Sequence, residues 1–153
     1  MMMMQQTITL ETIQKYCGGT IFSRGMEYYR QNMFHSTYKY KACIGGQCRG
    51  SFGRSYHVEI TLDSLSYNGI NYSSCTCPTE HYPVCKHVAT ALITWHYSPD
   101  SFKQKNEFEM ILMQKSKKWI VNVILDYAKT DSRIAKHIIN AAHAKTRRKR
   151  NKC

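Results

Sequence analysis

Residues 75–87 read CTCPTEHYPVCKH and place three cysteines and a histidine within one short stretch. The order is Cys-x-Cys, a seven-residue loop with two prolines, and Cys-x-His. Structural zinc sites are tetrahedral and are filled by cysteine thiolates and histidine nitrogens. Cysteines two positions apart at the end of a strand project from the same face, and the prolines turn the chain back. The stretch therefore predicts a Zn(2+) site whose ligands are Cys75, Cys77, Cys85 and His87.

A helix is expected directly after the second pair of ligands. Apolar residues follow at helical spacing over residues 88–97, as Val88, Ala91, Leu92 and Trp95. Cys85 and His87 then lie at the N-terminus of this helix, where the partial positive charge favours a thiolate.

Other interpretations of these residues remain open. The cysteines are alternatively free buried thiols with His87 on the surface, or His81 replaces His87 as a ligand. A disulfide between Cys75 and Cys77 has poor geometry. Four ligands close the site, so Glu80, the only adjacent acid, is interpreted as a solvated loop residue rather than a general base. The chain is predicted not to be an enzyme, a metal hydrolase or nuclease being the weakest hypothesis, and no small-molecule substrate is expected.

The composition favours an anionic partner. The chain has 153 residues, enough for one compact domain with some decoration, and 42% of them are hydrophobic. Lys and Arg number 22 against 10 Asp and Glu, a formal net charge of +12. This excess fits nucleic acid, an acidic protein face or a membrane surface, and does not choose among them.

The cysteine count and the N-terminus indicate an intracellular protein. Seven cysteines are an odd number, which argues against a closed disulfide framework. The first residues, MMMMQQTITL, lack the charged region of a secretory signal. Nowhere do about eighteen apolar residues follow one another, so no membrane span is expected. The predicted location is the cytoplasm or nucleoid, or the nucleus in a eukaryote.

Glycine and asparagine set the expected ends of the N-terminal helices. Residues 8–16 have helical apolar spacing, and Cys17-Gly18-Gly19 follows as a stop because glycine adopts the C-cap conformation easily. A second helix is expected from Ser23, a plausible N-cap, to Asn32, which tolerates a positive φ.

The sequence pattern of residues 36–73 predicts a β-sheet. STYKYKACI and YHVEITLD alternate, and the Asn68-Gly69 pair is a hairpin signal, so three or four antiparallel strands are expected. Tyrosines in these strands are expected to pack against a helix rather than to stack on bases. They are Tyr38, Tyr40, Tyr56, Tyr67 and Tyr72.

Residues 98–115 are predicted to be a linker with a short ordered piece at FEMILM. A hairpin of two amphipathic helices over residues 116–144, with a turn at 129–131, and a basic tail over 145–153 are expected next. The predicted fold is α+β: N-terminal helices, the first within residues 1–19, a small antiparallel sheet with the zinc site over 20–97, and a C-terminal helical hairpin.

The zinc stretch and its surroundings resemble the SWIM-type zinc finger. The residues that carry the resemblance are Cys77-Pro78 and Cys85-Lys86-His87-Val88-Ala89. Upstream, Phe22-Ser23-Arg24-Gly25 through Tyr28-Tyr29 is similar to the helix that often precedes this finger, and Arg24 with Tyr28 is interpreted as a structural contact. Arg49-Gly50-Ser51 followed by Tyr56–Ile60 looks like the glycine turn and strand before the ligands.

The resemblance implies a zinc-stabilised ββα-type finger that binds DNA or proteins, as a small stand-alone member. Asn32 stands where a glycine is common, and the spacing Cys43-x4-Cys48 is not expected of the family. These two cysteines are interpreted as ordinary thiols, or alternatively as half of another metal site with Cys17. Helicase or transposase bodies that often accompany this finger are absent, so their activities are not carried over.

The tail is the predicted nucleic-acid contact. Its basic residues are Lys145, Arg147, Arg148, Lys149, Arg150 and Lys152. The alternatives are a targeting signal or a solvated end. The leading prediction is a zinc module that binds nucleic acid, DNA in the first place, with low sequence specificity. The alternative is a zinc-stabilised protein–protein adaptor for a DNA-processing or chromatin partner.

Overall fold

The computed structural model describes residues 8–63, 66, 68–78 and 84–150, with the backbone alone at 142 and 144–150. The chain divides into two compact units, with the boundary between Glu107 and Phe108. The first unit combines a small sheet with helices, and the second is helical. The predicted α+β class is confirmed.

The first unit carries the sheet and the predicted zinc ligands. Its elements are α1 (Leu10–Cys17), α2 (Gly19–Arg30), β1 (Phe34–Tyr40), β2 (Cys43–Arg49), the 3-10 turn η1 (Ser51–Gly53), β3 (Ser55–Leu62), β4 (Ile70–Cys75), α3 (Lys86–Tyr97), the 3-10 turn η2 (Pro99–Ser101) and β5 (Lys103–Gln104).

Local chemistry sets the ends of the N-terminal helices. Thr9 caps α1, since its side-chain oxygen accepts the Thr12 N–H at 3.2 Å. Gly18, at φ +80°, ends α1 as expected, but the chain enters α2 at once at Gly19. The prediction that Ser23 is an N-cap is wrong, because Gly18 alone makes the turn and Ser23 lies exposed inside α2.

Asn32 terminates α2 in the predicted way. Its φ is +53°, and its N–H donates to the Tyr29 carbonyl at 2.9 Å. The Met33 N–H donates to the Tyr28 carbonyl at 3.1 Å. These two bonds form a Schellman motif, in which asparagine takes the place of the more common glycine.

The sheet has the strand order β4-β3-β2-β1-β5. Strands β1 to β4 pair antiparallel, as predicted, whereas the short β5 pairs parallel with β1. The stretch 36–44 was expected to be one strand. It instead contains the turn between β1 and β2, with Lys41 at φ +50°. The Asn68-Gly69 pair ends a longer connection over residues 63–69, in which the Asn68 side chain accepts the Ile70 N–H.

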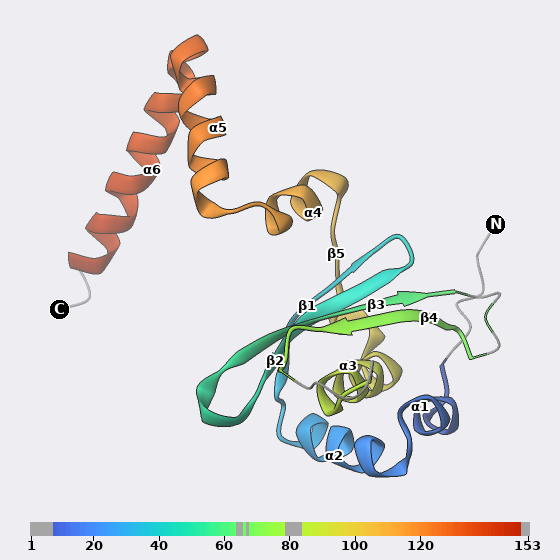
Figure 1. Cartoon of the computed structure of the whole chain (residues 1–153). Helices are drawn as coiled ribbons and strands as arrows, with labels where there is room; N and C mark the ends of the chain where they lie inside the picture. The colour runs from blue at the N-terminus through green and yellow to red at the C-terminus, as the bar shows by residue number, and fades with distance from the viewer. Residues whose placement is uncertain (1–7, 64–65, 67, 79–83, 151–153) are drawn as a thin grey trace. The chain divides into compact units, whose positions relative to one another are not determined.

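Helix α3 lies between the sheet and the helices α1 and α2 (Figure 1). Nine consecutive residues, His87–Trp95, are buried, so α3 is covered on every side. A helix that is buried all round belongs to the centre of a core rather than to its surface. Trp95 meets Phe102 edge-on, with ring centroids 5.0 Å apart.

Gly25 allows α2 and α3 to pack closely. Thr90 donates its hydroxyl to the Gly25 carbonyl at 3.3 Å. A Cβ atom on Gly25 would lie 2.5 Å from the Ala89 Cβ and 3.1 Å from backbone atoms of Ala89 and Thr90. Only glycine fits this helix crossing without a shift of backbone.

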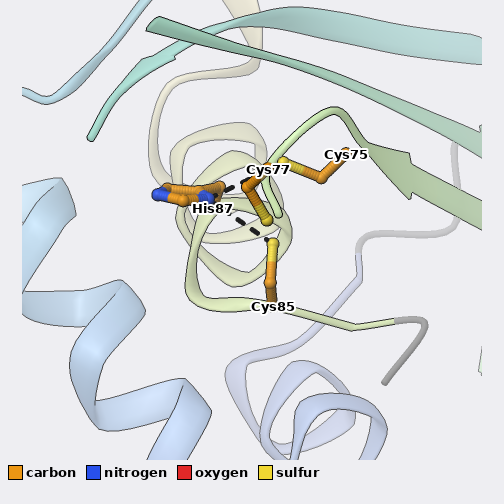
Figure 2. Close-up of side chains that lie close together, drawn as sticks. All are labelled: Cys75, Cys77, Cys85 and His87. Atoms are coloured by element: carbon orange, nitrogen blue, oxygen red, sulfur yellow. Dashed lines mark hydrogen bonds between the residues drawn. The ribbon is translucent and has the colours of Figure 1, made fainter. Parts of the chain in front are cut away.

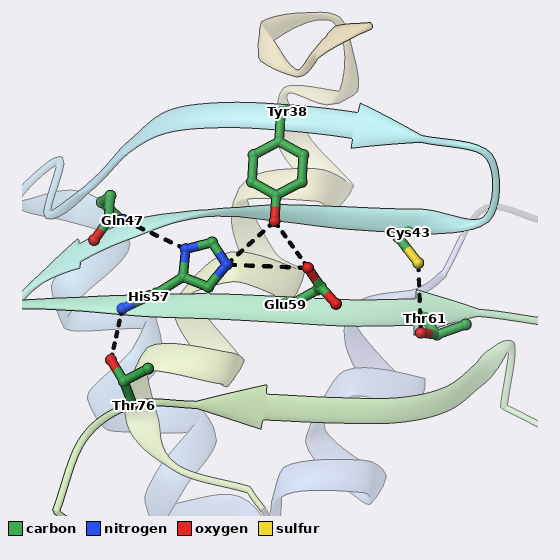
Figure 3. A network of polar contacts seen from close by, with 7 residues as sticks. All are labelled: Tyr38, Cys43, Gln47, His57, Glu59, Thr61 and Thr76. Atoms are coloured by element: carbon green, nitrogen blue, oxygen red, sulfur yellow. Dashed lines mark hydrogen bonds and ion pairs between the residues drawn. The ribbon is translucent and has the colours of Figure 1, made fainter. Parts of the chain in front are cut away.

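The face of the sheet opposite α3 carries a polar network (Figure 3). The Tyr38 side chain crosses over Gly45, donates to the Glu59 carboxylate at 3.1 Å and lies 3.2 Å from His57 Nε2. Burial, and then the Glu59 charge, raises the pKa of the Tyr38 hydroxyl, which therefore remains a donor. Tyr38 is buried, but it lies over Gly45 on the face of the sheet away from α3 and so does not pack against that helix as predicted. Tyr72 is exposed, and Tyr67 lies outside the described residues.

The second unit consists of α4 (Glu107–Gln114), α5 (Lys117–Thr130) and α6 (Ser132–Arg150). The predicted hairpin turn is confirmed, since α5 ends at Thr130 and the Asp131 side chain accepts the Arg133 N–H at 2.9 Å. Residues 98–115, interpreted as a linker, contain η2, β5 and α4. Helix α5 has no buried residue. Within the described residues, no helix combines the length and hydropathy of a membrane span.

Candidate metal centre

The four predicted ligands converge between the end of β4 and the start of α3 (Figure 2). Cys75 is the last residue of β4, and Cys77 follows two positions later. Cys85 is the N-cap of α3, and His87 lies in its first turn. All four ligand atoms lie within 4.8 Å of one another. The structure therefore brings together the four residues that the sequence spacing predicts as ligands.

Distances within the cluster fit a tetrahedral zinc ion. His87 Nδ1 lies 3.6 Å from the Cys75 Sγ and 3.6 Å from the Cys85 Sγ. Zinc–sulfur bonds of about 2.3 Å and zinc–nitrogen bonds of about 2.0–2.1 Å put sulfur and nitrogen about 3.6 Å apart in a tetrahedron. The donor set of three thiols and one imidazole therefore fits zinc in both chemistry and size.

The Cys75 and Cys85 thiols interact within the cluster, and the interaction favours the thiolate at Cys85. Their hydrogen bond is the main cause that lowers the pKa of Cys85, and His87 and the Val88 N–H at the helix start lower it further, while burial opposes them. The same hydrogen bond, and then burial, raises the pKa of Cys75. Cys85 is the predicted thiolate at the N-terminus of α3. All three cysteine ligands must be thiolates to hold a divalent cation, so its binding would release the protons that remain on the thiols.

His87 presents Nδ1 to the cysteines and turns Nε2 away from them (Figure 2). The side chain is 4% exposed, and Nε2 has no hydrogen-bond partner within the described part of the chain. The rings of Tyr56 and Tyr28 flank it, with centroids 4.9 and 5.8 Å away. These two tyrosines fix the imidazole by packing, and Tyr28 has the structural role expected for it.

The comparison with known families decides the type of site. Residues 56–96 match the family model of the SWIM zinc finger, and this range includes all four ligands. The chain contains a SWIM-type zinc finger. No curated protein and no solved structure matches the chain.

The four residues that would hold zinc in the SWIM finger would fill all four positions of a tetrahedral ion, so no coordination position would remain for water or a substrate. Bound zinc at a closed site of this kind supplies folding energy rather than Lewis-acid chemistry. His81, the alternative ligand, lies outside the described residues. Glu80, which is interpreted as a solvated loop residue, also lies outside them. A metal ion held by these four residues would join the end of β4 to the start of α3.

The other described cysteines do not form a second cluster. Cys43 and Cys48 are the first and sixth residues of β2 and so face opposite sides of the sheet. Within the described residues, the four SWIM ligands are the one group of at least three potential metal ligands. The alternative of a metal half-site with Cys17 is therefore not supported.

Burial predicts different reactivities for these thiols. Burial raises the pKa of Cys17 and that of Cys48 to about 12, whereas Cys43 is partly exposed. In the zinc-loaded protein at about pH 8, iodoacetamide is expected to modify Cys43 and to spare Cys17 and Cys48, because the thiolate is the reacting species. Peptide mapping by mass spectrometry measures this, with Cys153 exchanged for serine. Modification of Cys48 at the rate of Cys43 would contradict the described packing, and denaturant should remove the difference.

The predicted nucleic-acid residues of the tail are placed only in part. The backbone of residues 145–150 continues α6. Their side chains, and Lys152 as a whole, lie outside the described residues.

Proposed function

We propose that the chain is a non-enzymatic, zinc-stabilised module that binds nucleic acid, DNA in the first place, with little sequence preference. The observation that carries the proposal is the distribution of charge. From residue 28 to residue 58 the sequence has no aspartate or glutamate, and its basic residues are Arg30, Lys39, Lys41, Arg49 and Arg54. Together with the net charge of +12, this composition favours a polyanion.

The absence of an enzymatic role belongs to the same proposal. The four metal ligands are the number that fills a tetrahedral site. The Tyr38 hydroxyl donates to the Glu59 carboxylate and its pKa is raised, which favours a structural hydrogen-bond donor over a nucleophile. Contacts to phosphate give affinity without sequence readout, so low specificity is expected.

Fluorescence anisotropy of the full, zinc-loaded chain tests the proposal. Labelled single- and double-stranded DNA and RNA are titrated over a series of salt concentrations. The logarithm of the affinity should fall linearly with the logarithm of the salt concentration, by about 0.9 for each contacted phosphate of a duplex. A variant with the six basic tail residues exchanged for glutamine should lose part of this slope and still bind. Exchange of the tail lysines for arginine is the matched control and should change little.

A second candidate function, a protein–protein adaptor, is favoured by one observation on the second unit. Helix α5 leaves several large apolar side chains exposed, among them Leu125 at 54% and Tyr127 at 64%. Exposed apolar surface of this kind is typical of an interaction site. If the full chain binds none of the nucleic acids in the titration, the nucleic-acid proposal fails and the adaptor becomes the leading candidate.

A further inference from the structure

The loop between β2 and β3 projects an aromatic side chain into solvent. The loop is closed by the Gly50 N–H, which donates to the Arg54 carbonyl at 2.7 Å. At its tip, Phe52 has φ +61° and ψ +29°, the left-handed conformation that a bulky residue rarely adopts. Its side chain is 101% exposed. Phe52 therefore accepts backbone strain without gaining any burial, and such residues are found where a ligand is bound.

The base of the loop is fixed by packing. Gly50 is buried against the Tyr56 ring, which a Cβ atom on Gly50 would meet at 2.2 Å. Tyr56 in turn packs on His87 of the SWIM finger. The tip is thus held on a short, supported turn beside the metal centre.

Positive charge surrounds this turn. Arg49 and Arg54 stand at its two ends, and both are exposed. Ser51 and Tyr56 line a cavity of about 300 Å³ beside the metal ligands, and Arg24 and Lys86 line the same cavity. Arg24 is exposed and lines this cavity. The sequence between residues 28 and 58, which contains the loop, has no acidic residue.

We propose that this turn binds single-stranded nucleic acid, with an unpaired base stacked on Phe52 and backbone phosphates held by Arg49, Arg54, Arg24 and Lys86. The inference rests on the proposed function and assigns it a site on the folded SWIM finger. Every base has a flat face that stacks on an aromatic ring, and single strands leave these faces open. In a duplex the faces are covered by neighbouring pairs. The basic side chains at the ends of the turn and in the adjoining cavity favour a polyanion over an apolar protein pocket.

The test uses the full, zinc-loaded chain with a labelled oligothymidine, the matching oligouridine and a DNA duplex. The central variant is Phe52→Asn, because asparagine tolerates the left-handed conformation and removes only the ring. It should melt no lower than the parent protein and bind the single strands about 5- to 160-fold more weakly, the range of base stacking on an aromatic side chain. Phe52→Trp should retain binding. Tyr72→Ala is the matched control, since Tyr72 is 63% exposed on β4 of the same sheet and should leave binding unchanged.

The outcomes separate the site from the function. Weaker single-strand binding in Phe52→Asn alone, with parental stability, supports the site, and the oligothymidine and oligouridine arms give its DNA or RNA preference. Equal binding by the parent, Phe52→Asn and Tyr72→Ala overturns the site and leaves nucleic-acid binding in place. Equal losses on duplex and single strand overturn the stacking of an unpaired base. Failure of the parent protein to bind any of the probes overturns both proposals.

Discussion

Exchange of Cys75 for serine is expected to abolish stoichiometric zinc binding and to unfold the first unit. The four ligands join β4 to the start of α3, and α3 is the buried centre of this unit. Structural zinc contributes about 10–16 kcal/mol in zinc-finger peptides, which equals or exceeds the typical stability of a domain, about 5–15 kcal/mol. His87→Ala should have the same effect. Elemental analysis gives the zinc content, and circular dichroism follows the melting.

Cys43→Ser provides the matched control for this experiment. Cys43 lies on β2 outside the cluster, 3.6 Å from the Thr61 hydroxyl, so its exchange should retain one zinc per chain and the parental melting curve. A Cys75→Ser protein that kept full zinc stoichiometry and melted like the parent would show that this ligand assignment is wrong.

The second large effect is expected from Gly25→Ala at the crossing of α2 and α3. The added methyl group would meet the Ala89 side chain at 2.5 Å and the backbone of α3 at 3.1 Å, and a backbone cannot yield as a side chain can. Overpacking of this kind costs about 1–3 kcal/mol. The free energy of unfolding, from denaturant titration of the zinc-loaded protein, measures the loss.

Two further variants make the Gly25 experiment decisive. Gly19→Ala changes the same helix where an added Cβ atom meets nothing within 4 Å, so it should not destabilise the protein. Ala89→Gly removes the nearest contact and should recover part of the loss when combined with Gly25→Ala. If Gly25→Ala and Gly19→Ala had equal stability, close packing of the two helices would not limit the fold.

The sequence allowed the metal centre to be predicted because its ligands lie within one short segment. Four ligand-type residues at this spacing have few alternative explanations, and the structure brings the same four together. Helix α3 was predictable from its apolar spacing, and the end of α2 from Asn32. In each of these cases the information is local.

The misread segments lack such local signals. The turn between β1 and β2 is made by Lys41 and Ala42, with no glycine, proline or asparagine to mark it. The short β5 pairs with β1 across more than sixty positions of sequence, so no local pattern indicates it. The roles of Gly25 and Phe52 were also missed, since one depends on a helix crossing and the other on a left-handed backbone and full exposure. These features arise from tertiary structure.

The burial of His87–Trp95 in α3 would give zinc supply a direct influence on the folded population of this protein. Cys85 and His87 lie at the start of α3, which packs against both the sheet and the N-terminal helices. The finger alone would leave this helix without its packing partners, so it is not expected to fold apart from the rest of the first unit. Zinc affinity and assembly of the whole first unit are therefore one equilibrium. Free zinc at 100 times the dissociation constant would stabilise the folded chain by about 2.7 kcal/mol, and a fall to the dissociation constant itself would leave about 0.4 kcal/mol of that stabilisation. Scarcity of the metal would thus act on this protein through its folded population.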